Sequence, residues 1–386
     1  MKICQVSSCY YPAWAYGGQA KVAYEITKRL AKRGHELTVY TTDAMDDGHR
    51  LDKGIKNIDG ANVYYFRNVS NLLAWKQRIT ISPEMISVVK NEIERFDIIH
   101  IHGFRDFQSC VIHHYAQKYG IPYIIQPHGS VPLLGKKKAK KVFDYLFGQN
   151  ILNNSARILA LNEIEEKTCM EMGLVKNNIK MISNGIDLSE YGSLPAKGLF
   201  KKCYNLKEDD KIILYLGRIH KNKGLDILVR AFAKTLEEIN DVKLVIAGTD
   251  DGYLLALEQL TNLLNIKNKV LFTGFLNQEE KIMAYVDSEV FVTPSFTGFP
   301  LTFLEAMALG VPIITTNKWD VIKGIDNRLG YVVEYNEKSI KNALMKILLD
   351  EKLRDRLQRN CRHEIIRYEW DTITDEIERI YNSVLT

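Results

Sequence analysis

The segment from Pro294 to Thr316, PSFTGFPLTFLEAMALGVPIITT, combines residue types that suit a diphosphate. A Gly-Phe-Pro turn precedes a helical pattern, and Pro300 suits the first helical position because its missing N–H costs nothing there. The free amides of residues 301–303 would then point at the turn, with the positive end of the helix dipole behind them. Helical side chains lean toward the N-terminus, so Glu305 can reach a ribose diol beside the phosphates. The segment predicts a site for a sugar nucleotide.

Two cations follow a predicted strand in LYLGRIHKNKGLDILVRAF, residues 214–232. The strand ends at Gly217, Arg218 comes next, and Lys223 opens the following helix. Two converging cations suit a diphosphate, since arginine binds as a fork and lysine as a point charge. A lysine at a helix start opposes the dipole, which favours a ligand there. The alternative is a pair of solvated surface cations.

Two further segments lie at predicted strand ends in the first half of the chain. His128, in QPHGSVP, directly follows the predicted strand Tyr123–Ile125. Such a position faces the ligand crevice of an α/β domain, so His128 could hydrogen-bond a sugar hydroxyl; a satisfied structural histidine is the alternative. Gly17-Gly18 precedes a long amphipathic helix and would let backbone amides approach a phosphate, or form only a tight turn.

His100 and His102 lie on one face of a predicted strand. A zinc site would need further ligands, so a packed, hydrogen-bonded pair is the favoured interpretation. The chain contains no Asp-x-Asp pair, Walker loop or G-x-S-x-G elbow. We therefore predict no metal and no cofactor, with the nucleotide sugar as a substrate.

The composition is that of a globular protein: 386 residues, 46% apolar and 26% charged, with room for two domains. Scattered cysteines without a C-x-x-C pair and no apolar run of transmembrane length favour a cytoplasmic protein. The net charge of +5 is too small to indicate nucleic acid. The cluster Lys136–Lys141, followed by four apolar residues within 143–147, is either a solvated helix start or a patch for an anionic membrane surface or phosphorylated acceptor.

Short apolar strands alternate with amphipathic helices along the chain, which predicts parallel sheets with covered faces. A connector is expected at 188–210. The predicted strands are Ile3–Val6, Leu37–Tyr40, Val63–Phe66, Ile98–Ile101, Tyr123–Ile125, Ile158–Ala160, Lys180–Ile182, Ile212–Leu216, Leu244–Ile246, Val270–Phe272, Val290–Val292 and Ile313–Thr315. The predicted helices are Gln19–Lys32, Pro83–Arg95, Phe107–Lys118, Lys138–Asn153, Glu163–Met172, Leu225–Glu237, Tyr253–Leu264, Gln278–Val286 and Leu301–Ala308.

These motifs, taken in order, resemble the family 4 retaining glycosyltransferases. The matching segments are YPAWAYGGQAKVAYEITKRLAKRGHELTVYTT, DIIHIHGF, QPHGS, ISNGID, LYLGRIHKNKGLDILVRAF, VIAGTDDGY, VLFTGFL and PSFTGFPLTFLEAMALGVPIITT. The resemblance implies the GT-B fold, in which two Rossmann-like doubly wound α/β domains face each other across a cleft. It implies an acceptor-binding domain at 1–190, a donor-binding domain at 191–368, and a helix at 369–386 that crosses back to the first domain.

The resemblance also implies roles for the residues that would hold the nucleotide. Glu305 matches the second glutamate of the family's E-x7-E motif, which holds the donor ribose. Arg218 and Lys223 match the pair that neutralises the diphosphate and supports catalysis. Phe275, in TGFL, matches the segment whose backbone contacts the base.

The remaining implied contacts concern the phosphates and the transferred sugar. The amides of Leu301 and Thr302 would complete the phosphate site, and Gly217 belongs to the same donor site. Gly18 matches the glycine near the diphosphate and the sugar, and His128 matches the histidine beside that sugar.

One position departs from the family pattern. The first glutamate of E-x7-E would stand eight residues before Glu305, where this chain has Thr297. The family places that carboxylate against donor-sugar hydroxyls, and threonine bonds more weakly and without charge. The identity of the donor sugar is therefore left open.

The implied reaction transfers a hexosyl or N-acetylhexosaminyl group from a nucleotide sugar, with UDP favoured, to a saccharide or lipid-linked acceptor in surface-glycan synthesis. No protein nucleophile is expected; cations and helix amides would stabilise the leaving diphosphate. A sugar-nucleotide epimerase of the same architecture and a non-catalytic nucleotide-sugar sensor are the alternatives. The expected location is the cytoplasm, or the inner face of its membrane.

Overall fold

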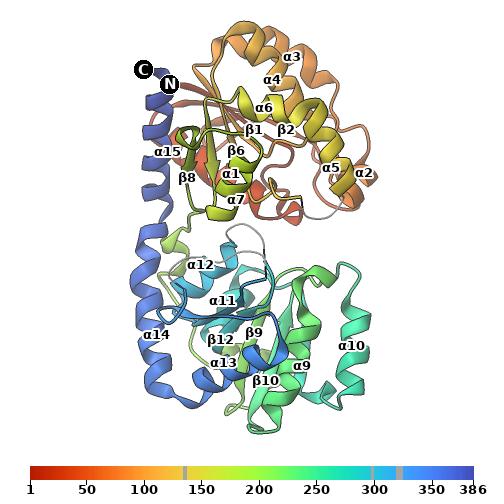
Figure 1. The fold of residues 1–386 in the computed structure, drawn as a ribbon, viewed down its shortest axis with the longest axis vertical. Helices are drawn as coiled ribbons and strands as arrows, with labels where there is room; N and C mark the ends of the chain where they lie inside the picture. Colours follow the sequence, from red (N-terminus) through yellow and green to blue (C-terminus); the bar gives the residue numbers. More distant parts are fainter. Residues whose placement is uncertain (134–136, 297–299, 319–324) are drawn as a thin grey trace. The chain divides into compact units, whose positions relative to one another are not determined.

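The computed structural model describes residues 1–133, 137–296, 300–318 and 325–386. The chain forms two compact units (Figure 1). Unit 1 comprises Met1–Gly185 together with Trp370–Thr386, and unit 2 comprises Ile186–Glu369.

Unit 1 is built on an eight-stranded sheet of order β3-β4-β2-β1-β5-β6-β7-β8. All neighbouring strands are parallel except β3 and β4, which are antiparallel. The strands are β1 (Lys2–Ser7), β2 (Glu36–Thr42), β3 (Gly54–Ile58), β4 (Ala61–Phe66), β5 (Ile98–His102), β6 (Tyr123–Gln126), β7 (Arg157–Ala160) and β8 (Ile179–Met181). The helices are α1 (Gly18–Lys32), α2 (Asn71–Gln77), α3 (Glu84–Glu92), α4 (Phe107–Tyr119), α5 (Lys137–Phe143), α6 (Gln149–Asn153), α7 (Glu163–Glu171) and α15 (Trp370–Leu385).

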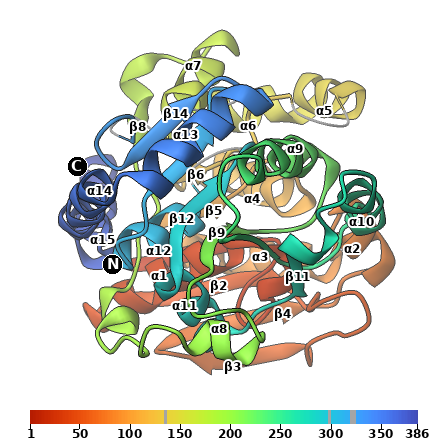
Figure 2. The same ribbon diagram turned by 90° about the horizontal axis from the view of Figure 1, so that it is seen from below.

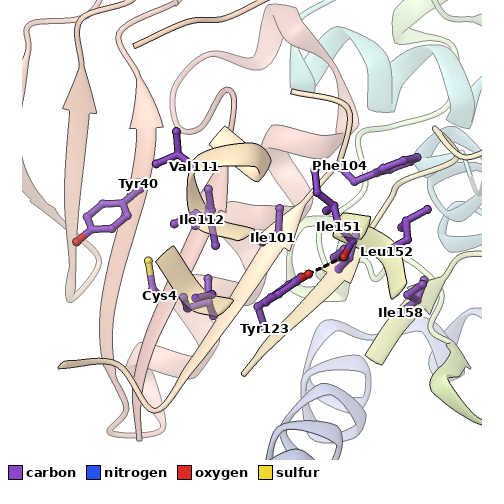
Figure 3. Close-up of a cluster of buried hydrophobic side chains, with 14 of the residues drawn as sticks. Cys4, Tyr40, Ile101, Phe104, Val111, Ile112, Tyr123, Ile151, Leu152 and Ile158 are labelled. Atoms are coloured by element: carbon purple, nitrogen blue, oxygen red, sulfur yellow. Dashed lines mark hydrogen bonds between the residues drawn. The ribbon is translucent and has the colours of Figure 1, made fainter. Parts of the chain in front are cut away.

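The two faces of this sheet differ in chemistry. One face carries the apolar core, in which Ile101 and Ile112 are buried and the Tyr123 hydroxyl donates to the Ile151 carbonyl at 2.6 Å (Figure 3). The central strands carry polar side chains between these core positions, among them Gln5 and His100, which are also fully buried. A buried polar side chain needs hydrogen-bond partners, so this second face requires specific pairing.

The last helix, α15, packs against α1. Trp370, Ile373 and Ile377 give it a buried apolar side, as their helical spacing predicts. Arg33 adds ion pairs along the edge of the contact, with its Nη1 2.9 Å from Glu378. The C-terminal segment is therefore an integral part of unit 1.

Unit 2 is built on a six-stranded parallel sheet of order β11-β10-β9-β12-β13-β14. The strands are β9 (Lys211–Leu216), β10 (Val242–Ala247), β11 (Val270–Gly274), β12 (Ser288–Thr293), β13 (Ile313–Thr316) and β14 (Gly330–Val333). The helices are α8 (Leu199–Cys203), α9 (Leu225–Leu236), α10 (Leu254–Leu263), α11 (Gln278–Val286), α12 (Leu301–Ala308), α13 (Glu337–Leu349) and α14 (Glu351–Glu364). Helices α9 and α13 lie side by side (Figure 2) and bury their apolar faces in the core of this unit.

The predicted parallel sheets are confirmed, but strand β14 and helix α2 were not predicted, and three further local predictions were incomplete. Strand β3 was not predicted because its residues are mostly exposed and lack an apolar pattern. The connector at 188–210 contains the short helix α8. The predicted helix 138–153 is interrupted by a π-helical turn at 144–148, where the partly buried Arg105 binds the Asp144 carboxylate with two nitrogens at 2.7 Å. Within the described parts of the chain, no helix combines the length and apolar character that crossing a membrane requires.

Candidate functional site

Three strand ends of unit 2 converge at the carboxyl edge of its sheet. The Gly217 amide donates to the Ala247 carbonyl at 3.0 Å, and the Gly248 amide donates to the Gly274 carbonyl at 2.7 Å. A Cβ on Gly248, whose φ is +144°, would lie 2.0 Å from the Gly217 carbonyl oxygen, so no side chain fits. Phe275 follows with 74% of its surface exposed. The structure thus brings two predicted positions, Gly217 and Phe275, to one edge.

Arg218 continues from this edge and is exposed. Its Nη1 lies 2.6 Å from the Asp251 carboxylate, and its carbonyl accepts from the Tyr215 hydroxyl at 3.0 Å. An ion pair between two exposed side chains contributes only about 0–1 kcal/mol. The guanidinium can therefore exchange Asp251 for a diphosphate at little cost.

Lys223 is half-buried beside Arg218. Its pKa is lowered, first by burial of the ammonium and then by the positive charge of Arg218. No described residue forms a hydrogen bond or ion pair with this ammonium. Lys223 is thus a half-buried cation beside a second cation, Arg218, and has no counter-charge among the described residues. This arrangement favours an anionic ligand.

The prediction that Lys223 opens a helix was wrong in detail. Lys223 ends a 3-10 turn, and α9 begins at Leu225 after Gly224, which has φ +70°. A Cβ on Gly224 would lie 2.7 Å from the Tyr335 hydroxyl and 3.2 Å from Pro294. This close approach brings the turn that contains Lys223 next to Pro294, the first residue of the segment that leads into α12.

The predicted helix Leu301–Ala308 is confirmed as α12, but the prediction that Pro300 is its first helical residue was wrong. Pro300 has ψ 130° and is the N-cap, so the helix begins at Leu301. The Phe303 amide donates to the Pro300 carbonyl at 3.1 Å and is not free, because the first turn closes on its own cap. The amides of Leu301 and Thr302 have no acceptor among the described residues. Thr297, the departure from the glutamate motif, lies outside the described residues.

Glu305 is buried, with 7% of its surface exposed, and is engaged on both oxygens. Lys281 Nζ lies 2.6 Å from Oε1, and the Tyr285 hydroxyl lies 3.4 Å from Oε2 and 3.0 Å from the Thr302 carbonyl. Burial and then the charge of Glu305 raise the pKa of Tyr285. A carboxylate has about four lone-pair directions, so Glu305 can still accept from a hydroxyl.

Sequence reasoning missed Lys281 and Tyr285. They are four residues apart on α11 and therefore share a helix face, which is a local signal. Nothing in that spacing indicates that this face packs on α12.

In unit 1, Gly18 is the first residue of α1, and its amide has no acceptor among the described residues. The next side chain, Gln19, donates from Nε2 to the His102 carbonyl at 2.6 Å. His102 Nδ1 in turn lies 2.9 Å from His128 Nε2. The structure thus brings His128 and Gln19, the residue after Gly18, to one strand end.

His128 itself has φ 56°, an uncommon conformation for a residue other than glycine. The turn is held by Glu165 on α7, whose oxygens accept from the Gly129 amide at 2.8 Å and the Leu161 amide at 3.0 Å. Strain of this kind persists only where surrounding contacts fix it.

The prediction that His100 and His102 form a packed pair is confirmed. Their rings stack with centroids 4.2 Å apart, and each ring is hydrogen-bonded to other side chains. In the described ranges there is no group of three or more His, Cys, Asp or Glu side chains able to hold a metal ion.

Comparison with known families identifies the group to which the chain belongs. The model for Glycosyltransferase Family 4 matches residues 16–190, and the model for Glycosyl transferases group 1 matches residues 197–364. The chain belongs to glycosyltransferase family 4. It is therefore an enzyme of glycosyl transfer.

Individual relatives of this glycosyltransferase extend over nearly the whole chain. A glycosyltransferase of Methanocaldococcus jannaschii is 29% identical over 99% of this chain and 98% of its own length. The N-acetyl-alpha-D-glucosaminyl L-malate synthase of Bacillus anthracis is 26% identical over 97% of this chain and 96% of its own. Anabaena HepE in complex with UDP and glucose superposes with a TM-score of 0.78 at 17% identity, covering 99% of this chain and 100% of that one. The fold of this glycosyltransferase is GT-B.

The lysine cluster of this glycosyltransferase falls mainly on α5; Lys136 lies outside the described residues. Lys137, Lys138 and Lys141 are exposed. Lys140 is half-buried near the Pro132 carbonyl, and burial lowers its pKa. Apolar side chains beside the lysines are also exposed: Val142 by 59%, Tyr145 by 86%, Leu146 by 54% and Phe147 by 48%.

Proposed function

We propose that this glycosyltransferase retains anomeric configuration and moves a hexosyl or N-acetylhexosaminyl group from a UDP sugar to a saccharide or lipid-linked acceptor in surface-glycan synthesis. The observation that carries the proposal is the half-buried ammonium of Lys223 beside Arg218, with no counter-charge among the described residues. A nucleoside diphosphate supplies the missing anion.

The proposal assigns the nucleotide to unit 2. Arg218, Lys223 and the amides of Leu301 and Thr302 bind the diphosphate, next to the backbone of Gly217. The Glu305 carboxylate accepts from the ribose hydroxyls while Lys281 balances its charge. The backbone at Phe275 contacts the base.

The proposal assigns the transferred sugar to Gly18 and His128 of unit 1. The amide of Gly18 donates toward the donor, and the ring of His128 bonds a sugar hydroxyl. Both residues lie near the His102 strand end, which supports a shared task.

The proposed chemistry uses no protein nucleophile. The bond from the anomeric carbon to the diphosphate oxygen breaks, an oxocarbenium-like centre forms, and the acceptor hydroxyl attacks from the same face. The leaving phosphate takes the acceptor proton. Arg218 and Lys223 stabilise the charge that develops on the leaving group, and losing one such donor typically costs roughly 10²–10³ in rate.

A thermal-shift panel of UDP, GDP and ADP sugars tests the donor, followed by mass spectrometry of the product. Arg218→Ala and Lys223→Ala should each lower transfer by roughly 10²–10³-fold while the circular dichroism spectrum stays unchanged. Lys221→Ala is the matched control, because Lys221 is exposed in the same turn as Lys223. Wild-type transfer by Lys223→Ala would contradict the assignment.

The same assays separate the alternatives. Inversion of the sugar without an acceptor would indicate an epimerase, and tight donor binding with neither transfer nor hydrolysis would indicate a sensor. We propose that no metal is needed, because the cations neutralise the diphosphate. Transfer that falls after treatment with EDTA and returns with a divalent cation would contradict this.

We also propose that the α5 patch rests on an anionic membrane that carries the acceptor, since exposed lysines adjoin exposed apolar side chains. Changing Lys137, Lys138 and Lys141 to Ser should reduce pelleting with vesicles of anionic phospholipid. Exposed lysines elsewhere in unit 1, changed to Ser in equal number, form the control: Lys32, Lys53 and Lys90. Equal pelleting of both variants would remove the idea.

A further inference from the structure

A chain of hydrogen-bonded side chains runs through the polar face of the unit 1 sheet. Gln5 on β1 and His102 on β5 are fully buried, and so is Tyr381 on α15. The Gln5 amide bonds both of the others: its Nε2 lies 3.1 Å from the Tyr381 hydroxyl, and its Oε1 lies 2.7 Å from His102 Nε2. The chain continues to His128 at one end and His100 at the other. We call these five side chains the histidine relay.

The orientation of the Gln5 amide sets the direction of every bond in the histidine relay. An amide oxygen only accepts, so the proton of neutral His102 must be on Nε2. Its Nδ1 is then an acceptor, and the bond of 2.9 Å to His128 Nε2 requires that His128 donate.

The other end of the relay follows the same logic. The Gln5 NH₂ group donates to the Tyr381 oxygen, which leaves the hydroxyl proton for His100 Nδ1 at 2.8 Å. The last helix of the chain thereby contributes to a network that ends at His128.

The three rings are neutral near pH 7. Burial lowers the pKa of His100 and of His128 to about 3, and it lowers the pKa of His102 well below its usual value. No ionised side chain of the described residues bonds any of these rings. A neutral ring has one donor nitrogen and one acceptor nitrogen, so fixing one of them defines the other.

Resting on the proposed role of His128 in binding the donor sugar, we propose that Gln5, His102 and Tyr381 are positioning residues that hold His128 with its proton on Nε2. The Nδ1 of His128 is then a hydrogen-bond acceptor, and it selects a hydroxyl of the transferred sugar as donor. No described residue bonds this Nδ1. A donor whose sugar lacks the hydroxyl facing His128 would leave Nδ1 without a hydrogen-bond donor, so the enzyme would select against that donor.

The decisive measurement needs no substrate. Protein labelled with ¹⁵N-histidine gives two-bond ¹H–¹⁵N spectra that distinguish the two tautomers, and signals missing from His128→Gln identify His128. At pH 7.5 we expect His128 and His102 to be neutral with the proton on Nε2. A proton on Nδ1 of His128, or averaged signals, would overturn the proposal even if the enzyme transfers sugar normally.

Variants of His102 test whether the neighbour sets this state. The Oδ1 of Asn occupies a place equivalent to Nδ1, so His102→Asn should keep the tautomer of His128 and most of the activity. His102→Leu removes the acceptor; it should mix the tautomers and lower kcat by about 3- to 10-fold, the effect of one neutral hydrogen bond. His114→Gln, on an exposed ring, is the control. Equal spectra for Asn and Leu variants would overturn the role of His102.

Tyr381→Phe tests the far end of the histidine relay while keeping the ring that packs in the α15 contact. Without the hydroxyl the Gln5 amide loses one partner and can rotate, so signals of both tautomers of His102 should appear. Unchanged signals would overturn the role of Tyr381. Because the spectra are read without donor or acceptor, a wild-type enzyme that lacks transfer but shows the expected tautomer would contradict the proposed function alone.

Discussion

Lowering the pH from 7.5 to 5.5 should destabilise unit 1 through its buried histidines. His100 and His102 have no exposed surface, and burial lowers the pKa of both, that of His100 to about 3. In the unfolded chain a histidine has a pKa of about 6.5. Between these values the unfolded state binds more protons than the folded state. The stability that the neutral rings contribute is therefore complete above about pH 6.5 and is lost as the pH falls.

The size of the loss follows from this difference. At pH 5.5 each unfolded histidine is stabilised by about 1.4 kcal/mol, so the two rings together lower the free energy of unfolding by about 3 kcal/mol. For a unit of about 200 residues this corresponds to a fall in Tm of roughly 6–12 °C. His128, whose pKa is also lowered to about 3, adds to the loss.

Calorimetry of the wild type and of His100→Phe at both pH values checks the reasoning. Phenylalanine keeps a flat ring in the stack with His102 but does not titrate. The fall in the free energy of unfolding between pH 7.5 and 5.5 that is assigned to the two rings should therefore be about half as large in this variant. His114→Gln, which changes an exposed histidine, should show the wild-type difference. A wild-type Tm that shifts by less than about 3 °C, or a His100→Phe protein with the full shift, would refute the account.

Three further predictions concern unit 2. Lys281→Met leaves the buried Glu305 carboxylate without its ion pair and should lower the free energy of unfolding in urea by about 3–5 kcal/mol. Adding Glu305→Gln to this variant should restore most of the lost stability, and additive losses would contradict the pairing. The kcat/KM for the donor should fall as the pH rises through the lowered pKa of Lys223, because only the ammonium binds the diphosphate. Lys223→Arg should move that fall to higher pH, and a pH profile unchanged by this substitution would assign the ionisation to another residue. Gly248→Ala places a methyl group against the Gly217 carbonyl and should destabilise the fold by at least about 1–3 kcal/mol in the same urea assay, and wild-type stability would contradict the packing of these strand ends.

Local sequence patterns were sufficient for most of the fold. A run such as Ile212–Leu216 is apolar throughout and short, which favours a strand buried on both faces, and such strands form parallel sheets. Strand β3 lacked this signal because it lies at the sheet edge and remains mostly exposed. Edge strands need less apolar surface, which makes them hard to find from the sequence.

Part of the candidate site was equally local. Arg218 and Lys223 come shortly after the end of β9. Their place in the candidate site could therefore be predicted from the position of that strand alone. The bounds of α12 were predicted correctly as Leu301–Ala308, but Pro300 proved to be its cap and the Phe303 amide proved to be bonded. Which amides of a first turn are free depends on how the turn closes, and its residue types leave several closures open.

The amino-acid sequence by itself determined the alternation of strands and helices, the glycines where backbones meet, and the cations at the carboxyl ends of strands, since each depends on neighbours along the chain. Only the tertiary structure decided the partners of the buried polar groups. Lys281 meets Glu305 across two helices, and Gln5 bonds both His102, 97 residues away, and Tyr381, 376 residues away. A buried charge or amide must find a partner, but the folded packing, and not the spacing along the chain, determines which residue it meets.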